Sequence, residues 1–426
     1  MNVTSELRTT VNGTSTRATS AGLSILATLF FMWGFVTVLN DVLVPHLKSV
    51  FALNYTQTLL IQFVFFGAYF LLALPGARLI ELVGYKRAIV TALIVTAIGA
   101  AIFVPASTLP SYPLFLLALF VLASGITVLQ VAANPYVALM GSPQTSSSRL
   151  NLVQAFNSLG AACAPYVGGQ LILGNSVAGR SLEGALITPA QRMADALAVR
   201  APYIGITVLF VALALVIALW PLPKPAANDA PEGHVGESIL RKPRLLFGIG
   251  AIFFYVGAEI AVGSFLINYI SSARVGNMPP DEAAFYVTLF WSGAMAGRFL
   301  GAGILRMIRP HALLAANAAL AAMLVFVSIV TGGHAALWSI VLVGLMNSIM
   351  FPTIFTLAIE GLGHLTQRGS GLLIMAIVGG AVIPLTQAAI ADRLSLQISF
   401  ILPIVCYSYV LFFALRCRTP VTQSGT

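Results

Sequence analysis

The chain has 426 residues, of which 58% are hydrophobic and 8% are charged, and its mean hydropathy is +0.94. No soluble core needs so much apolar surface, so the composition excludes an ordinary globular protein and favours a polytopic membrane protein in contact with a lipid bilayer. The net charge of +9 comes from basic residues spread singly over short loops, which excludes a nucleic-acid-binding surface and indicates membrane topology.

Twelve apolar stretches are long enough to cross a bilayer, for which a helix needs about 20 residues. They cover residues 21–44, 57–79, 87–106, 113–139, 149–172, 201–221, 245–270, 283–304, 311–331, 335–358, 370–390 and 396–415. The sequence therefore predicts an all-α polytopic membrane protein with 12 transmembrane helices. Because most of the 22 lysines and arginines lie on the side of the N-terminus, we expect both termini to be cytoplasmic, in a bacterial inner membrane.

The predicted spans divide the chain into two six-helix bundles. A polar tail, 1–20, precedes the first bundle, 21–221. Residues 222–243 are rich in proline, alanine and charge, which predicts a flexible cytoplasmic linker. The second bundle covers 244–415, and a short cytoplasmic tail, 416–426, follows it.

Two patterns recur between the bundles at an offset of about 220 residues, which indicates duplication and pseudo-symmetry. The pattern Phe-Phe-x-x-Gly begins at Phe30 and again at Phe253. A second pattern has the same spacings at Arg149, Gly160 and Pro165 and at Arg368, Gly379 and Pro384. The glycines and prolines of this second pattern indicate either deformable helices beside a cavity or close packing of small residues between helices.

The loop after the second span, residues 77–87, carries one acid and paired basic residues. It resembles the loop signature of the major facilitator superfamily in a degenerate form, with Ala77 at the first glycine and Glu81 at the acid. Such an acid can pair across the cytoplasmic face and hold one conformation, although a solvated charge cluster would have the same sequence. We assign this latch role to Glu81, Lys86, Arg87, Arg149 and Arg298.

The stretch 124–160 carries the most specific resemblance in the chain. Its Ala-Ala-Asn-Pro at 132–135 and the polar series from Arg149 to Gly160 resemble the fucose/glucose/galactose:H⁺ symporter family of that superfamily. Further matching blocks lie at 39–41, 255–259, 297–301 and 351–380, so the resemblance spans nearly the whole chain. It implies a major facilitator fold and uptake of a monosaccharide by alternating access.

The resemblance also implies roles for individual residues. Asp41 matches the acid associated with proton coupling, and Gln154 and Asn157 match polar positions that face the sugar. Gln130 stands where the fucose pattern has a glutamate, and Glu259 stands where that pattern has an amide. This exchange favours the glucose/galactose subgroup, and it makes Glu259 a second candidate for proton coupling.

Polar side chains inside the predicted spans support the same conclusion independently. A hexose offers several hydroxyls that both donate and accept hydrogen bonds, so its site needs inward-facing carboxylates and amides. An intramembrane acid is by default a candidate functional site. The alternative for each is a hydrogen bond between helices. We predict that the substrate contacts Asn40, Gln130, Asn134, Gln154, Asn157, Glu259, Asn268 and Asn347.

The expected mechanism is secondary active transport without an organic cofactor or a structural metal. The proton is the expected coupling cation and sodium is the alternative, since a carboxylate with amides serves either. No phosphate-cradling loop for ATP and no enzyme-like set of nucleophile and base occurs in the sequence. A fucose or polyol symporter, an exporter of small metabolites or drugs, and a sugar sensor are the alternatives, and we expect the chain to act as a monomer.

Overall fold

The computed structural model describes residues 22–39, 51, 55–108, 111–168, 197, 199–221 and 238–419. In the first bundle these residues form a first helix, Gly22–Leu39, then α2 (Tyr55–Thr108), α3 (Tyr112–Leu139), the 3₁₀ turn η1 (Pro143–Thr145), α4 (Ser146–Gly168) and α6 (Arg200–Leu219). In the second bundle they form η3 (Ile239–Arg241), α7 (Pro243–Ser271), α8 (Pro280–Ile304), α9 (Pro310–Val330), α10 (Gly333–Asn347), α11 (Met350–Ile359), η4 (Gly363–Leu365), α12 (Thr366–Met375), η5 (Ala376–Val378), α13 (Gly379–Arg393), α14 (Leu396–Ser399) and α15 (Ile401–Arg416).

These helices account for the 12 predicted spans. Nine helical stretches of the described chain are long and apolar enough to cross a bilayer. One of them, Leu60–Thr108, is 49 residues long and contains two spans, because Gly84 has φ 79° and ψ 164° and breaks the helix. Glycine tolerates this backbone conformation, which side chains disfavour. The two remaining spans are α4 and α8, which are long enough but more polar than the others.

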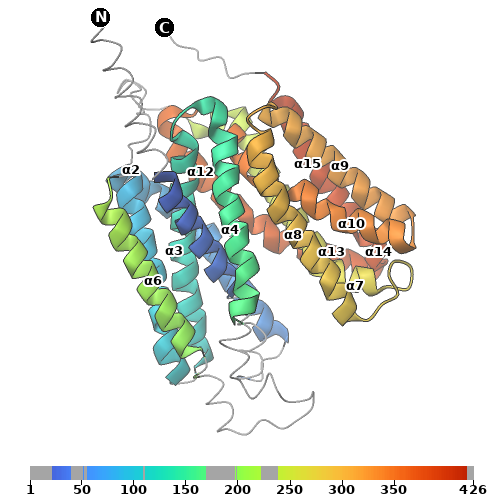
Figure 1. Ribbon diagram of the computed structural model, residues 1–426, viewed down its shortest axis with the longest axis horizontal. Coiled ribbons are helices and arrows are strands. Elements are labelled where there is room, and N and C mark those ends of the chain that lie inside the picture. Colours follow the sequence, from blue (N-terminus) through green and yellow to red (C-terminus); the bar gives the residue numbers. More distant parts are fainter. Residues whose placement is uncertain are drawn as a thin grey trace, which may run out of the picture.

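The two bundles lie side by side, with α4, α8 and α12 between them (Figure 1). The end of α6 and the start of α7 lie at one end of the molecule, and the Lys86 ammonium donates to the Trp220 carbonyl there (2.9 Å). We call this the linker end. The topology predicted from the basic residues places it in the cytoplasm. The last part of the predicted linker, 238–243, lies within the described residues and contains η3.

Hydrogen bonds join the two bundles near the linker end. The Ser147 hydroxyl contacts that of Thr356 at 2.6 Å, and the Ser148 hydroxyl donates to the Ala302 carbonyl at 2.6 Å. The Ser370 hydroxyl donates to the Val131 carbonyl at 2.9 Å. Away from this end the helices of the two bundles diverge (Figure 1). The described residues therefore form a molecule that is closed at the linker end.

The repeated glycines lie at matching helix crossings. A β-carbon on Gly160 in α4 would overlap with the Phe31 carbonyl of the first helix, and one on Gly379 in α13 would overlap with the Phe253 carbonyl of α7. Close packing is therefore one role of these glycines. Of the two described helices that carry these glycines, the eleventh span is interrupted by the 3₁₀ turn η5 directly before Gly379, whereas α4 continues through Pro165 to Gly168.

Gly160→Ala and Gly379→Ala should each destabilise the protein by about 1–3 kcal/mol, because overpacking forces the backbones apart. Thermal unfolding of the purified protein would measure the effect. Gly205→Ala in α6 is the matched control, since a β-carbon at Gly205 has no neighbour within 4 Å. Equal melting temperatures for Gly160→Ala and Gly205→Ala would contradict the packing role.

Candidate functional site

A cavity of about 190 Å³ lies between the two bundles. Helices of both bundles form its wall, and the break at η5 contributes Ile377. The lining residues are Trp33, Gly34, Thr37, Val38, Tyr69, Gln130, Gln154, Asn157, Ala161, Val256, Glu259, Arg298, Phe351, Pro352 and Ile377. The cross-bundle contacts of α4 and α12 come from residues nearer the linker end than Gln154 and Ile377, so this cavity is closed toward that end.

The first bundle contributes three side-chain amides to the cavity wall. The Gln130 amide donates to the Tyr69 hydroxyl, and the Asn157 amide donates to the Phe30 carbonyl at 3.0 Å. The Gln154 amide donates to the side-chain oxygen of Asn134 at 3.3 Å. Each amide is thus oriented by a neighbour, which leaves its other polar atoms for a ligand that donates and accepts hydrogen bonds.

The second bundle contributes a charged pair to the same cavity. The Arg298 Nη2 atom lies 3.6 Å from Glu259 Oε1, and the two side chains are 15% and 12% exposed. Glu259 Oε1 is buried and accepts no hydrogen bond from the described residues. Arg298 also donates from Nε to the Ser348 carbonyl (3.2 Å) and from Nη1 to the Ser158 hydroxyl of α4. The guanidinium therefore joins the second bundle to the first.

The structure brings together four of the predicted substrate residues, namely Gln130, Gln154, Asn157 and Glu259. Their contact with substrate stays a prediction. Asn40 and Asp41 lie outside the described residues, whose first helix ends at Leu39.

The other three predicted substrate residues do not line the cavity. Asn134 is fully buried and lies behind Gln154, which it orients. Asn268 is exposed near the end of α7, away from the linker end. Asn347 is fully buried, and its backbone carbonyl accepts a hydrogen bond from the Tyr255 hydroxyl at 3.0 Å. Asn134 Nδ2 and both side-chain polar atoms of Asn347 are buried without a hydrogen-bond partner among the described residues, so contact of these three residues with substrate stays a prediction.

Arg298 lines the cavity, at a place where the sequence did not predict it. We predicted it as a latch at the cytoplasmic surface, whereas it lies inside α8 and lines the cavity. The missed signal was its position within the span 283–304, where an arginine needs an acidic partner. Trp33, Tyr69 and Phe351 also line the cavity and provide aromatic surface.

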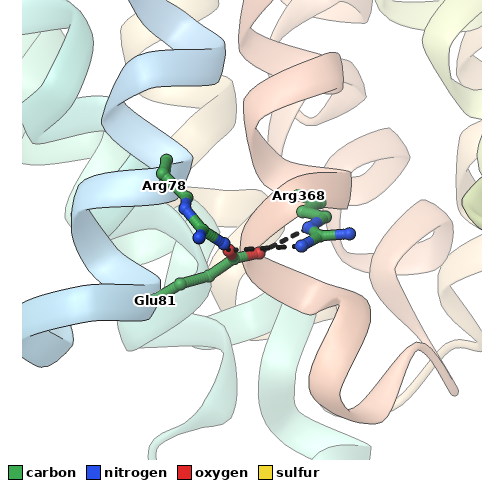
Figure 2. A network of polar contacts seen from close by, with 3 residues as sticks. All are labelled: Arg78, Glu81 and Arg368. Atoms are coloured by element: carbon green, nitrogen blue, oxygen red, sulfur yellow. Dashed lines mark hydrogen bonds and ion pairs between the residues drawn. The ribbon is translucent and has the colours of Figure 1, made fainter. Parts of the chain in front are cut away.

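Glu81 joins the two bundles at the linker end. Its Oε2 atom lies 2.8 Å from Arg78 Nη1 on the same helix, and its Oε1 atom lies 2.7 Å from Arg368 Nε on α12 (Figure 2). Glu81 thus pairs with a basic residue of the other bundle, and its role as a conformational latch stays a prediction. Its partner Arg368 was not predicted, although Arg368 occupies the repeat position that matches Arg149.

Three other predicted latch residues make no bond between the bundles within the described chain. Lys86 bonds to the Trp220 carbonyl of its own bundle, and the exposed Arg87 side chain makes no hydrogen bond or ion pair there. Arg149 donates to the Ala138 carbonyl (2.9 Å) and the Ser142 carbonyl (2.7 Å). Arg149 thus stabilises the end of α3, because the last carbonyls of a helix lack intrahelical donors.

Arg368→Gln should shift the conformational equilibrium two- to fivefold toward opening at the linker end, since an exposed ion pair contributes about 0–1 kcal/mol. Spin labels at the exposed residues Leu82 and Met307 would report the distance between the bundles. Arg87→Gln is the control, because it removes a charge from the same end without breaking an ion pair. An unchanged distance distribution in Arg368→Gln would contradict the latch role.

Among the described residues no three His, Cys, Asp or Glu side chains could hold a metal ion together. The described residues of the cavity wall offer hydrogen bonding by amides, one carboxylate and one guanidinium, with aromatic side chains beside them. These groups recognise a small polar solute whose hydroxyls donate and accept.

The fold and the central cavity define a transporter of the alternating-access type. Residues 23–384 match the Major Facilitator Superfamily, and the chain belongs to that superfamily. The chain is 50% identical over 398 residues to a glucose/galactose transporter of Brucella abortus, which covers 92% of this chain and 93% of the relative. It is 35% identical over 402 residues to the L-fucose-proton symporter of Escherichia coli, with 92% of each covered. Within the superfamily the chain belongs to the family of these sugar symporters, and it is a transporter rather than an enzyme.

A solved structure supports the same assignment. The fucose-proton symporter of Escherichia coli in the outward conformation superposes with a TM-score of 0.86 at 32% sequence identity. The match covers 94% of this chain and all of the symporter chain.

Proposed function

We propose that the protein takes up a hexose such as glucose or galactose by cation-coupled symport, with the proton as the coupling cation. The observation that carries this proposal is the cavity between the bundles, where amides of the first bundle face Glu259 and Arg298 of the second. Its volume of about 190 Å³ lies below that of pockets for drug-sized ligands, which measure about 300–1,000 Å³. The 50% identical glucose/galactose transporter supports the choice of hexose.

The same proposal includes the setting of the protein. We expect it to work as a monomer in a bacterial inner membrane with both termini in the cytoplasm. The cavity supports a functional monomer, since a single chain forms its wall. The basic residues of the linker end support the cytoplasmic position of the termini.

Uptake into proteoliposomes tests the proposal. Labelled glucose, galactose, fucose and a polyol would be offered while proton and sodium gradients are imposed separately. We expect accumulation of glucose or galactose with the proton gradient alone. Accumulation with a sodium gradient alone would identify sodium as the coupling cation. Accumulation of fucose but of neither hexose would contradict the substrate assignment.

Glu259→Gln should weaken hexose binding at least tenfold, because a hydrogen bond to a charged group contributes about 1.5–3 kcal/mol. Glu259 lines the cavity, and its Oε1 atom accepts no hydrogen bond from the described residues. Fluorescence titration would measure the affinity, since Trp33 lines the same cavity. Glu282→Gln is the control, because Glu282 is exposed in the first turn of α8. Unchanged affinity in Glu259→Gln would remove this residue from the site.

A further inference from the structure

A second cavity, of about 350 Å³, lies at the linker end of the second bundle, far along α7 from Glu259. The first turn of α7, the segment after α11 and the end of α15 form its wall. Three basic residues, Lys242, Arg244 and Arg416, line it together with one acid, Glu360. The sugar-binding proposal uses none of these residues.

Among the described residues, the one carboxylate of this basic pocket does not balance the two arginines, Arg244 and Arg416. Arg244 Nη2 lies 2.6 Å from Glu360 Oε2, so the one carboxylate already has a partner. Arg244 Nε is buried and lacks a hydrogen-bond acceptor among the described residues. Arg416 forms no ion pair with the described carboxylates; its guanidinium lies over the rings of Phe412 (5.2 Å) and Phe247 (5.6 Å).

The pocket wall also contains a thiol, that of Cys417. Burial raises the pKa of the Cys417 thiol in the pocket wall, although the charge of Arg244 opposes this shift. The thiol therefore stays neutral at physiological pH and does not compensate the arginines.

The pocket adjoins apolar surface that faces lipid in a spanning helix. Leu246 and Phe412 are each 39% exposed, and Leu415 is 51% exposed. Phe247 and Phe413 continue this apolar surface into the pocket. An anion that fits this arrangement has a charged group for the arginines and a hydrocarbon part for the helix surface. Basic pockets between transmembrane helices on the cytoplasmic side recognise lipid head groups in this way.

We propose that the basic pocket binds the phosphate group of an anionic phospholipid. The phosphate accepts hydrogen bonds from Arg244 and Arg416, and the acyl chains lie along Phe412 and Leu246. A planar guanidinium suits phosphate because it donates two parallel hydrogen bonds. The site belongs to the second bundle alone, so its occupancy does not depend on the identity of the sugar.

Native mass spectrometry of the full-length protein in detergent tests this proposal, with phosphatidylglycerol and phosphatidylcholine as probes. We expect one phosphatidylglycerol adduct at lipid concentrations where phosphatidylcholine gives none. Arg244→Gln with Arg416→Gln should weaken this adduct at least tenfold. Lys86→Gln with Arg87→Gln is the matched control, because it removes the same charge from the linker end of the other bundle.

Equal phosphatidylglycerol binding by the pocket variant and the wild type would overturn the proposal. An equal loss in the control variant would also overturn it, because diffuse charge would then explain binding. If inorganic phosphate displaces phosphatidylglycerol at equal concentration, the site serves a soluble anion and the lipid assignment is wrong. Should the double variant fail to fold, Arg416→Gln alone carries the test, because this residue gives up no ion pair.

Discussion

Arg298→Gln should destabilise the protein by about 3–5 kcal/mol, because removing one partner of a buried pair leaves the other charge uncompensated. Glu259 would then remain 12% exposed without its cation, and α4 would lose the hydrogen bond from Arg298 to Ser158. The double variant Glu259→Gln with Arg298→Gln should recover part of the loss, since both charges are then absent. Thermal unfolding of the two single variants and the double variant would measure the coupling between the residues.

The same set of variants separates two roles of Arg298. Arg298→Lys retains the charge near Glu259 but has no planar fork to reach both Ser158 and the Ser348 carbonyl. We expect it to fold better than Arg298→Gln and to transport more slowly than wild type. If the effects of Glu259→Gln and Arg298→Gln on stability add without coupling, the ion pair does not contribute to stability.

The fold could be predicted from the sequence because each span depends on local composition. Apolar stretches of sufficient length identify the helices, and the crossings at Gly160 and Gly379 lie at residues that the repeat marks. The turn at Gly84 lies in the loop predicted between the second and third spans. The break at η5 could not be predicted in the same way. Glycine and proline occur in both repeats, yet of the two described helices the eleventh span is interrupted and α4 is not.

Part of the site could be predicted, because the polarity of a side chain inside a span is also a local property of the sequence. Gln130, Gln154, Asn157 and Glu259 line the cavity as expected for polar groups that must avoid lipid. The same argument cannot separate a cavity residue from one that is buried behind it, which explains Asn134. Partners from different bundles, such as Glu81 with Arg368, depend on tertiary packing that neither sequence segment encodes alone.

Asp41→Asn should abolish accumulation of hexose against its gradient while retaining sugar exchange. We propose Asp41 as the main coupling residue; it follows Thr37, a cavity residue, by four positions in the sequence. One elementary charge moving through 100 mV contributes about 2.3 kcal/mol, which supports roughly a fiftyfold sugar gradient. An asparagine cannot take up or release the proton, so this contribution should be lost.

Two assays on the same vesicles distinguish coupling from binding. Exchange of labelled for unlabelled hexose requires a binding site that alternates between the two sides, but it requires no net movement of cation. Asp41→Asn should therefore exchange sugar and fail to concentrate it, whereas Glu259→Gln should lose both in proportion to its weaker binding. Asp392→Asn, an exposed acid at the end of α13, is the control for loss of a carboxylate. If Asp41→Asn still concentrates hexose under an imposed proton gradient, the proton is carried elsewhere, and Glu259 becomes the remaining cavity acid to test, because linkage requires the coupling group to interact with the sugar site.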